Sequence, residues 1–388
     1  MTPAARVQGA IEVFDRLLAK GEMVDVVLRG WAKENRYAGS KDRLAIADMV
    51  YDALRKRKSL SVRGGGLSGR QVLYALLLHH NIDPESIYTG QKYAPDIWSE
   101  AERSTMGEPN GDALYDLPDW LVPMWRRELG EESLSLAQTL TARAPVFLRT
   151  NLLQVTRDKL CTSLEKEGII SQNHINVSTA LVVKDGYRQI RHSMAYQHGN
   201  CELQDASSQA SVADLPDTVQ GPILDFCAGA GGKSLALAAH YKSAIDAHDG
   251  LPHRMAAIPA RAKRAGAEIH IKEASDLKEK HYGLVFCDMP CSGSGTWRRD
   301  PLGKWTLEAK QFESLLKLQA SILENAAAYV RSGGYLVYAT CSVLKSENAD
   351  QIHRFLSLHS GWNAQKMKQF WPDQDGDGFF YCQLHKQM

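Results

Sequence analysis

The chain has 388 residues, enough for two or three domains that each have a core of their own. Hydrophobic residues make up 44% and charged residues 23%, which is the usual balance of a soluble globular protein. The formal net charge is only +1, so the charge of the whole chain does not favour nucleic acid as a partner, and any basic surface must be local.

The cysteine pattern indicates the cellular compartment and bears on whether the chain binds a structural metal. The chain has seven cysteines and no Cys-x-x-Cys spacing. An odd number in a chain of this size argues against a disulfide framework and for a reducing compartment, and the missing spacing argues against structural zinc. No apolar run reaches membrane-spanning length, and the N-terminus lacks a signal-type apolar core. We expect a cytoplasmic, monomeric protein that binds neither a metal nor a membrane.

Residues 1–135 are predicted to form a helical domain. Apolar residues recur at helical spacing from Val7 to Leu18, and Gly21 is expected to end this first helix. Similar stripes predict helices over 44–54, 72–78 and 120–129, with a loop at 107–119. Residues 136–205 differ, because a strand at 146–151, a helix at 156–167 and short β-like pieces predict a small α+β module.

Residues 206–388 alternate between strand and helix. Strands are predicted at 223–226, 244–249, 269–272, 284–288 and 335–340, and helices at 233–240, 251–265 and 312–330. This alternation indicates an α/β domain with a mostly parallel sheet that has helices on both faces.

A glycine-rich turn at residues 225–234 joins the first of these strands to a helix. Glycines let the backbone turn tightly and approach a ligand closely. A phosphate-binding Walker loop would need glycine where Cys227 stands, and a dinucleotide GxGxxG motif would need glycine in place of Ser234. The cofactor S-adenosylmethionine fits better, because it carries no phosphate and needs only a close backbone.

Acidic residues end the strands that follow this turn. They are Asp249, Asp276 and Asp288. A carboxylate after the second strand can bind ribose hydroxyls. Each acid alone is more often a helix cap or part of a solvated loop, but three in succession after one glycine turn favour a cofactor site.

Two cysteines stand at the C-terminal ends of predicted strands, where ligands of α/β sheets bind. Cys291 follows Asp288-Met289-Pro290, and Cys341 follows Ala339-Thr340. Carbon 5 of cytosine becomes nucleophilic when a thiolate adds to carbon 6, so one cysteine can attack while the other assists elimination. Asp288 can hydrogen-bond the edge of the base. On chemistry alone either cysteine can be the attacker, and the alternative is that both are small buried hydrophobes.

The loop 292–301 carries Trp297, Arg298 and Arg299 between the two cysteines. Arginine can hold phosphate, and tryptophan can stack on an unpaired base. The loop therefore favours an RNA contact, with a solvated loop as the alternative.

Together these segments resemble the RsmB/NOL1/NOP2/Sun family of RNA cytosine-5 methyltransferases. The resemblance rests on the Asp-x-Cys-Ala-x-x-Gly-Gly-Lys run at 225–233, the two cysteine segments at 288–295 and 338–342, the Glu347-Asn348 pair and the segment 204–209. It implies that residues 206–388 form a Rossmann-like, S-adenosylmethionine-dependent methyltransferase domain.

The family also implies roles by position. Cys341 would be the nucleophile, Cys291 would promote product release, Asp288 would contact the base, and Lys233 would lie beside the active site. The expected cofactor-binding residues are Cys227, Ala228, Gly229, Ala230, Gly231, Gly232, Lys233, Asp249, Asp276 and Asp288.

The N-terminal helices resemble a NusB-like RNA-binding domain, on the segments 39–43 and 51–58. In the second segment, Arg55, Lys56 and Arg57 are expected to contact RNA phosphates, with a solvated helix end as the equal alternative. The small module resembles an RRM-like domain, with Arg149 in its first strand as a further RNA contact.

The resemblance implies an RNA substrate, 16S rRNA rather than tRNA. Two alternatives remain. One is the same chemistry on tRNA, and the other is a non-catalytic RNA-binding factor of ribosome assembly. The presence of both Cys291 and Cys341 argues against the second, because a scaffold needs neither thiol.

Overall fold

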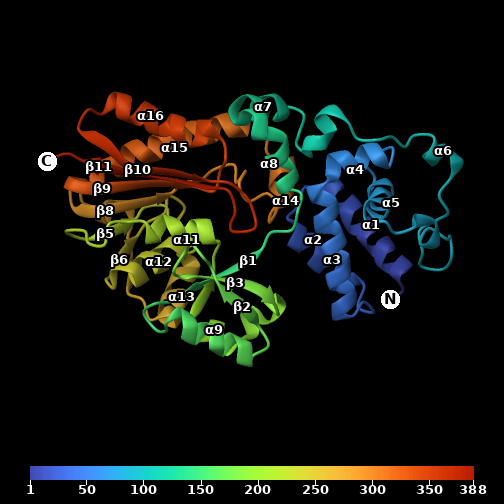
Figure 1. Cartoon of the computed structure of the whole chain (residues 1–388), viewed down its shortest axis with the longest axis horizontal. Coiled ribbons are helices and arrows are strands. Elements are labelled where there is room, and N and C mark those ends of the chain that lie inside the picture. Colours follow the sequence, from blue (N-terminus) through green and yellow to red (C-terminus); the bar gives the residue numbers. More distant parts are fainter. The chain divides into compact units, whose positions relative to one another are not determined.

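A computed structural model describes residues 1–388, apart from the side chain of Lys20. The chain forms two compact units, and each contains two stretches of sequence (Figure 1). One unit comprises Met1–Arg143 and Trp297–Ala309, and the other comprises Ala144–Thr296 and Lys310–Met388. We expected one continuous domain from residue 206 onwards, so the grouping of 297–309 with the N-terminal helices differs from that expectation.

The first unit is helical. Its helices are α1 (Pro3–Lys20), α2 (Val24–Glu34), α3 (Ser40–Arg55), α4 (Arg57–Arg63), α5 (Gly69–His79), α6 (Glu100–Arg103), α7 (Val122–Leu129), α8 (Ser133–Thr139) and α14 (Pro301–Thr306). At the start of α1 the side chain of Thr2 accepts the backbone N–H of Ala5, and Gly21 ends the helix at φ 62°, as expected. Phe14, Trp31 and other apolar side chains of α1–α5 form the core.

The late segment 297–309 completes this helical core. Lys304 Nζ donates to the backbone oxygen of Arg55 at 2.8 Å, and Trp305 Nε1 donates to that of Leu54 at 2.7 Å. These carbonyls lie at the C-terminal end of α3, where a helix has no partners of its own for them. The ring of Trp297 stacks on that of Trp125 at 5.9 Å between centroids. The segment therefore supplies both packing and hydrogen bonds that residues 1–143 lack.

The second unit contains two sheets. The smaller is antiparallel in the order β2-β3-β1-β4. Its strands and associated helices are β1 (Val146–Thr150), α9 (Arg157–Lys166), β2 (Ile170–Asn173), β3 (Ala180–Asp185), α10 (Met194–Gln197) and β4 (Cys201–Leu203). Leu160 and Leu164 of α9 pack on Leu148 and Leu181 of the sheet, so this part is a small α+β module.

The larger sheet has seven strands in the order β10-β11-β9-β8-β5-β6-β7. Its elements are α11 (Ala206–Ala213), β5 (Ile223–Asp225), α12 (Gly232–Tyr241), β6 (Ile245–Ala247), α13 (Ile258–Ala265), β7 (Ile269–Ile271), β8 (Tyr282–Asp288), α15 (Ala309–Tyr329), β9 (Val330–Thr340), α16 (Ala349–Leu358), β10 (Trp362–Phe370) and β11 (Phe379–Lys386). Strands β5 to β9 pair in parallel, whereas β10 and β11 form an antiparallel edge that we did not predict. Helices α15 and α16 cover one face, and α11 and α12 cover the other (Figure 1).

The parallel register brings four strand ends to one edge of this sheet. Asp225 of β5 pairs with Ala247 of β6 and with Phe286 of β8, and Asp288 pairs with Ala339 of β9. The segments that follow these strands therefore converge. Among the described residues, no helix has both the length and the apolarity to cross a membrane, and no group of His, Cys, Asp and Glu could hold a metal ion.

Candidate active site

The glycine turn after β5 has a backbone that only glycine adopts readily. Gly229 has φ 49° and Gly231 has φ 84°. A Cβ atom at Gly231 would lie 2.9 Å from Ile258 Cγ1. Helix α12 begins directly after this residue. The two glycines therefore let the backbone turn directly from β5 into the start of α12.

Asp249 follows β6 and binds this turn. Its side chain is 3% exposed, and its two oxygens accept the backbone N–H groups of Gly229 and Leu251, both at 2.9 Å. Arg254 Nη1 lies 3.2 Å from the same carboxylate. Asp249, the acid predicted after the second strand, therefore lies against the glycine turn and accepts a hydrogen bond from its backbone.

A cavity of about 720 Å³ opens at this edge of the sheet. It is lined by Phe226, Cys227, His248, Asp249, Gly250, Leu251, Arg254, Ala274, Glu279, Pro290, Leu318, Ile322, Glu324, Asn325, Ala328 and Tyr329. The rings of Phe226 and Tyr329 and the aliphatic side chains of α15 suit a purine ring, and the carboxylate of Asp249 suits ribose hydroxyls. These residues fit S-adenosylmethionine.

All the predicted cofactor residues except Lys233 and Asp288 fall into three groups. Cys227 and Asp249 line the cavity, and the residues 228–232 form its turn. Asp276 is exposed and accepts the backbone N–H of Glu273 at 3.1 Å; its neighbour Ala274, rather than Asp276, lines the cavity. The role of Asp276 stays a prediction. The α15 side chains were missed, because an amphipathic helix gives no sequence signal for a ligand wall.

Lys233 holds Asp288 in place. The lysine side chain is only 3% exposed, and its Nζ donates to Ser208 Oγ at 2.5 Å and to Asp288 Oδ2 at 3.3 Å. The ring centroids of Phe286 and Phe379 lie 5.7 Å and 4.6 Å from the same Nζ. Asp288 itself is 37% exposed, so its carboxylate is oriented and still accessible.

Asp225 is a buried acid at the start of the turn. It is fully buried, and its Oδ2 accepts the hydroxyl of Ser234 at 2.6 Å, whereas its Oδ1 is buried without a hydrogen-bond partner. Burial raises the pKa of Asp225 to about 7, against the opposing effect of the Ser234 hydrogen bond. The nearby negative charge of Asp288 also raises this pKa.

Cys291 and Cys341 meet, because they follow β8 and β9, which are parallel neighbours. Their Sγ atoms lie 3.4 Å apart, and both thiols are free and partly exposed. Contact with Cys341, then burial, then the charge of Glu347 raise the pKa of Cys291 well above its ordinary value. The structure thus brings together the pair of thiols that two separate segments predicted.

Arg149 is buried, whereas a contact with RNA requires a side chain at the surface. It is 5% exposed, and its Nη1 donates to Gln204 Oε1 at 2.5 Å and to the backbone oxygen of Gly232 at 2.8 Å. Burial lowers its pKa to about 10. Our expectation is corrected here, because this guanidinium ties β1 to the start of α12 and does not face solvent.

Four of the basic residues that we expected to contact RNA, Arg55, Lys56, Arg57 and Arg298, are buried or half-buried in the helical unit. Arg55 is 9% and Arg298 is 2% exposed, and Arg55 Nε donates to the backbone oxygen of Arg298 at 2.7 Å. Lys56 pairs with Asp52, and Arg57 lies over the Trp305 ring at 5.0 Å. Arg298 therefore does not lie at the surface where RNA could bind. Residues 55–57 make more contacts within the protein than we expected of RNA-binding side chains.

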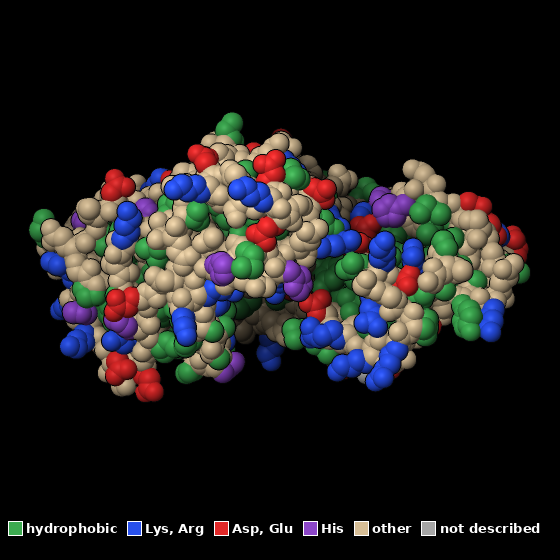
Figure 2. All heavy atoms as spheres, turned by 90° about the horizontal axis from the view of Figure 1, so that it is seen from below, with side chains coloured by type: hydrophobic (Ala, Val, Ile, Leu, Met, Phe, Trp, Pro, Cys, Tyr) green, Lys and Arg blue, Asp and Glu red, His purple; other side chains and the backbone are tan. Residues whose placement is uncertain are grey.

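Arg299 is exposed and borders a cavity inside the helical unit. This cavity measures about 440 Å³ and is lined by Ala47, Asp48, Tyr51, Asp52, Arg55, Arg143 and Arg299. Lys and Arg side chains gather on part of the helical unit in Figure 2, whereas both signs are mixed on the visible face of the other unit. A local basic surface thus exists despite the near-neutral net charge.

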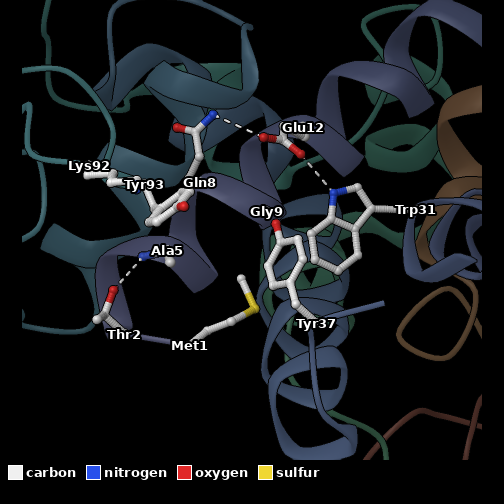
Figure 3. Close-up of a pocket in the computed structure, with 10 residues that line it drawn as sticks. All are labelled: Met1, Thr2, Ala5, Gln8, Gly9, Glu12, Trp31, Tyr37, Lys92 and Tyr93. Atoms are coloured by element: carbon white, nitrogen blue, oxygen red, sulfur yellow. Dashed lines mark hydrogen bonds between the residues drawn. The ribbon is translucent and has the colours of Figure 1, made fainter. Parts of the chain in front are cut away.

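A further cavity of about 460 Å³ lies among the helices of the N-terminal part (Figure 3). Glu12 accepts the indole N–H of Trp31 at 2.8 Å and the amide of Gln8 at 3.3 Å, and Tyr37 and Tyr93 are exposed at its rim. Neither a cysteine nor a glycine turn lines it, so we assign it no part in the chemistry.

Known proteins resemble this chain in sequence. A family model described as 16S rRNA methyltransferase RsmB/F matches residues 215–385, and a model of the RsmF/B-like ferredoxin-like domain matches residues 117–188. The ribosomal RNA small subunit methyltransferase B of Serratia proteamaculans is 31% identical over 293 residues, which are 71% of this chain and 68% of the relative.

Solved structures share the fold. The crystal structure of PH0851 aligns over 100% of this chain and 99% of its own, with a TM-score of 0.79 and 23% identity. NSun6 from Pyrococcus horikoshii, solved with the S-adenosylmethionine analogue SFG, aligns over 70% of this chain and 98% of its own, with a TM-score of 0.60 and 19% identity. By its sequence, its sheet and its cofactor turn, the chain belongs to the RsmB/F family of S-adenosylmethionine-dependent RNA methyltransferases.

Proposed function

We propose that this protein methylates carbon 5 of a cytosine in 16S rRNA through a covalent bond between Cys341 and carbon 6. The observation that carries this proposal is the 3.4 Å separation of two free thiols beside the oriented carboxylate of Asp288. The relative named ribosomal RNA small subunit methyltransferase B supports the choice of RNA.

The reaction has two parts. The Cys341 thiolate adds to carbon 6, and the electron pair of the C5–C6 double bond becomes available at carbon 5. S-adenosylmethionine, when bound, supplies the electrophilic methyl group. A base then takes the proton from carbon 5, the double bond re-forms, and the C6–S bond breaks with its electron pair returning to Cys341.

The surroundings of the two thiols support Cys341 as the attacker. The raised pKa of Cys291 favours the protonated thiol of this residue. Its S–H group can then donate to the Cys341 thiolate. Asp288, which Lys233 holds in place, is positioned to accept a hydrogen bond from the edge of the base.

Outside the pocket of the methyltransferase domain, we assign RNA binding to the helical unit and to the small β1–β4 module. We propose that the helical unit is NusB-like and that the β1–β4 module is RRM-like. Arg299 is exposed and lines a cavity together with Arg55 and Arg143, which supports it as a phosphate contact. Free cysteines throughout the chain fit a cytoplasmic enzyme.

Bisulfite sequencing of RNA from a deletion strain tests the proposal. We expect one 5-methylcytosine to be lost from 16S rRNA. The wild-type gene and the control Cys161→Ala should restore it, whereas Cys341→Ala should not. A loss confined to tRNA would overturn the choice of substrate, and no loss in either RNA would leave a non-catalytic assembly role.

A further inference from the structure

A fully buried carboxylate lies beside the two thiols and is not part of the reaction described above. Glu347 ends the 3-10 turn Lys345–Glu347 and is 0% exposed. It accepts the backbone N–H of Ser292 at 2.8 Å, the Ser292 and Ser342 hydroxyls at 2.5 Å each, and Gln319 Nε2 at 3.0 Å. All four donors are uncharged, so none of these partners neutralises the carboxylate.

Two of these partners directly follow the two cysteines. Ser292 comes after Cys291, and Ser342 comes after Cys341. One carboxylate therefore ties together the two loops that carry the thiols. A direct contact adds to this, because the hydroxyls of Ser294 and Ser342 lie 2.8 Å apart.

Asn348, the next residue, anchors the Cys341 loop from a second side. Its Nδ2 donates to the backbone oxygen of Ser342 at 2.9 Å, and its Oδ1 accepts the Thr340 hydroxyl at 2.5 Å. Cys341 is thus flanked on both sides by residues that Asn348 binds. Together with Glu347, this leaves little freedom in the spacing of the two thiols.

Titratable groups that interact with Cys291 are Cys341 after β9, Glu347 of the 3-10 turn and Tyr338 of β9. Cys341 and Glu347 raise the pKa of Cys291, whereas the backbone N–H of Gly293 lowers it. Tyr338 of β9 donates its hydroxyl to the backbone oxygen of Glu347 at 2.5 Å, and α15 contributes the neutral Gln319, whose Nε2 donates to the backbone oxygen of Pro290. Once Cys341 is bonded to carbon 6 its sulfur can no longer ionise, and Glu347 is then the acidic side chain that still acts on Cys291.

We propose that Glu347 is a positioning residue that sets the spacing of the two cysteines and, through its charge, the pH range in which Cys291 acts during product release. This rests on the proposed function. Cys291 first loses its proton to solvent. The resulting thiolate takes the proton from carbon 5, the electron pair of that C–H bond re-forms the C5–C6 double bond, and Cys341 leaves as a thiolate.

The first test needs no RNA. In the full-length Cys341→Ser protein, which lacks the second thiol, the rate of Cys291 alkylation by iodoacetamide is followed by mass spectrometry across pH. Adding Glu347→Gln should move the midpoint of this profile to lower pH by about one unit, which is the usual effect of removing one nearby charge. Glu347→Asp keeps the charge and should keep the midpoint, and so should the exposed control Glu313→Gln on α15.

Two controls separate the loss of charge from a loss of structure. Circular dichroism checks that every variant is folded across the pH range, and each alkylation profile is normalised to its own maximum. Glu347→Asp shortens the side chain and disturbs the same hydrogen bonds, so a shift seen only with Glu347→Gln reports the charge. The proposal is overturned if folded Glu347→Gln has the same midpoint as the Cys341→Ser protein without it.

The second test uses RNA and separates this proposal from the proposed function. Wild-type enzyme is trapped on radiolabelled RNA, and the decay of the covalent adduct is measured across pH. Glu347→Gln should shift the midpoint of adduct release to lower pH and leave the methylation of carbon 5 possible, and Glu347→Asp should restore the wild-type midpoint. If the wild type forms no adduct, the proposed function fails, whereas the alkylation profile still decides the role of Glu347.

Discussion

The Sγ atoms of Cys291 and Cys341 lie 3.4 Å apart, close enough to exchange a proton. Contact with Cys341, then burial, then the nearby Glu347 raise the pKa of Cys291. At the scale of single residues, the raised pKa of Cys291 supports our proposal that Cys341 attacks and Cys291 promotes release.

Replacing Cys291 by alanine should trap the reaction halfway. Cys341 can still attack carbon 6, but the step that removes the proton from carbon 5 loses its base, so a covalent protein–RNA adduct should accumulate. A denaturing gel with radiolabelled RNA would show it as a slowly migrating band. The double variant Cys291→Ala/Cys341→Ala should form no adduct, and wild-type turnover by Cys291→Ala would contradict the release role.

Asp225→Asn should change how stability depends on pH. The folded-state pKa of Asp225 is raised to about 7, so the folded protein holds this proton more tightly than the unfolded chain does. The stability from this group is fully present below the unfolded-state pKa and is lost as pH rises towards 7. The asparagine variant keeps an uncharged group, and its free energy of unfolding should gain on the wild type by up to about 4 kcal/mol between about pH 4 and pH 8.

Urea unfolding at several pH values measures this difference. The exposed Asp217 offers a matched control, because Asp217→Asn removes an acid that is already solvated. A gap between wild type and Asp225→Asn that stays constant with pH would show that Asp225 does not carry a raised pKa.

At the scale of elements, the turn between β5 and α12 depends on two glycines in the left-handed region. Gly231→Ala should lower the free energy of unfolding by on the order of 1–3 kcal/mol, because the new Cβ is strained by φ 84° and meets Ile258 Cγ1 at 2.9 Å. Gly232→Ala, one residue later, has no neighbour closer than 4.0 Å and an ordinary φ, so its stability should hardly change. Equal effects of the two substitutions would refute the strain argument.

The sheet itself shows which elements sequence patterns reveal. Strands β5, β8 and β9 were expected, because a strand buried on both faces is a continuous apolar run. Strands β10 and β11 were both missed. The side chains of β10 are exposed or half-buried and show no apolar run, whereas β11 is a mostly buried strand that we did not identify. Strand β10 is recognisable only through its pairing with β11 at the edge of the sheet.

At the scale of the whole molecule, the helical unit needs a segment that lies far beyond residue 143 along the chain. The fragment 1–143 alone should therefore melt at a lower temperature than the same fragment with the peptide 297–309 added. Trp297 and Trp305 supply the ring contact and the hydrogen bond, so a peptide with both tryptophans replaced by alanine should not raise the melting temperature. Circular dichroism melts measure this, and a fragment that is indifferent to the peptide would contradict the assignment of 297–309 to this unit.

The cofactor turn, the order of the site's motifs and the meeting of the two cysteines could be predicted from the chain alone. Cys291 and Cys341 could be paired in advance, because the C-terminal ends of parallel strands share one edge of a sheet. The glycine positions and the acid at Asp249 follow from the same rule. Such features depend on local backbone geometry and on strand order, which short patterns encode.

The roles of the long cationic side chains, in contrast, became visible only in the folded protein. Arg149, Arg55 and Arg298 were expected at an RNA surface, yet all three are buried, and the first two donate to backbone carbonyls. Burial is a property of what packs on a residue from distant parts of the chain, so a basic run looks the same whether it is solvated or enclosed. The surroundings of Glu347 could not be predicted either, because its four hydrogen-bond donors come from three separate segments of the chain. Nor could the place of the segment 297–309, which packs in the helical unit although its neighbours in sequence belong to the other unit.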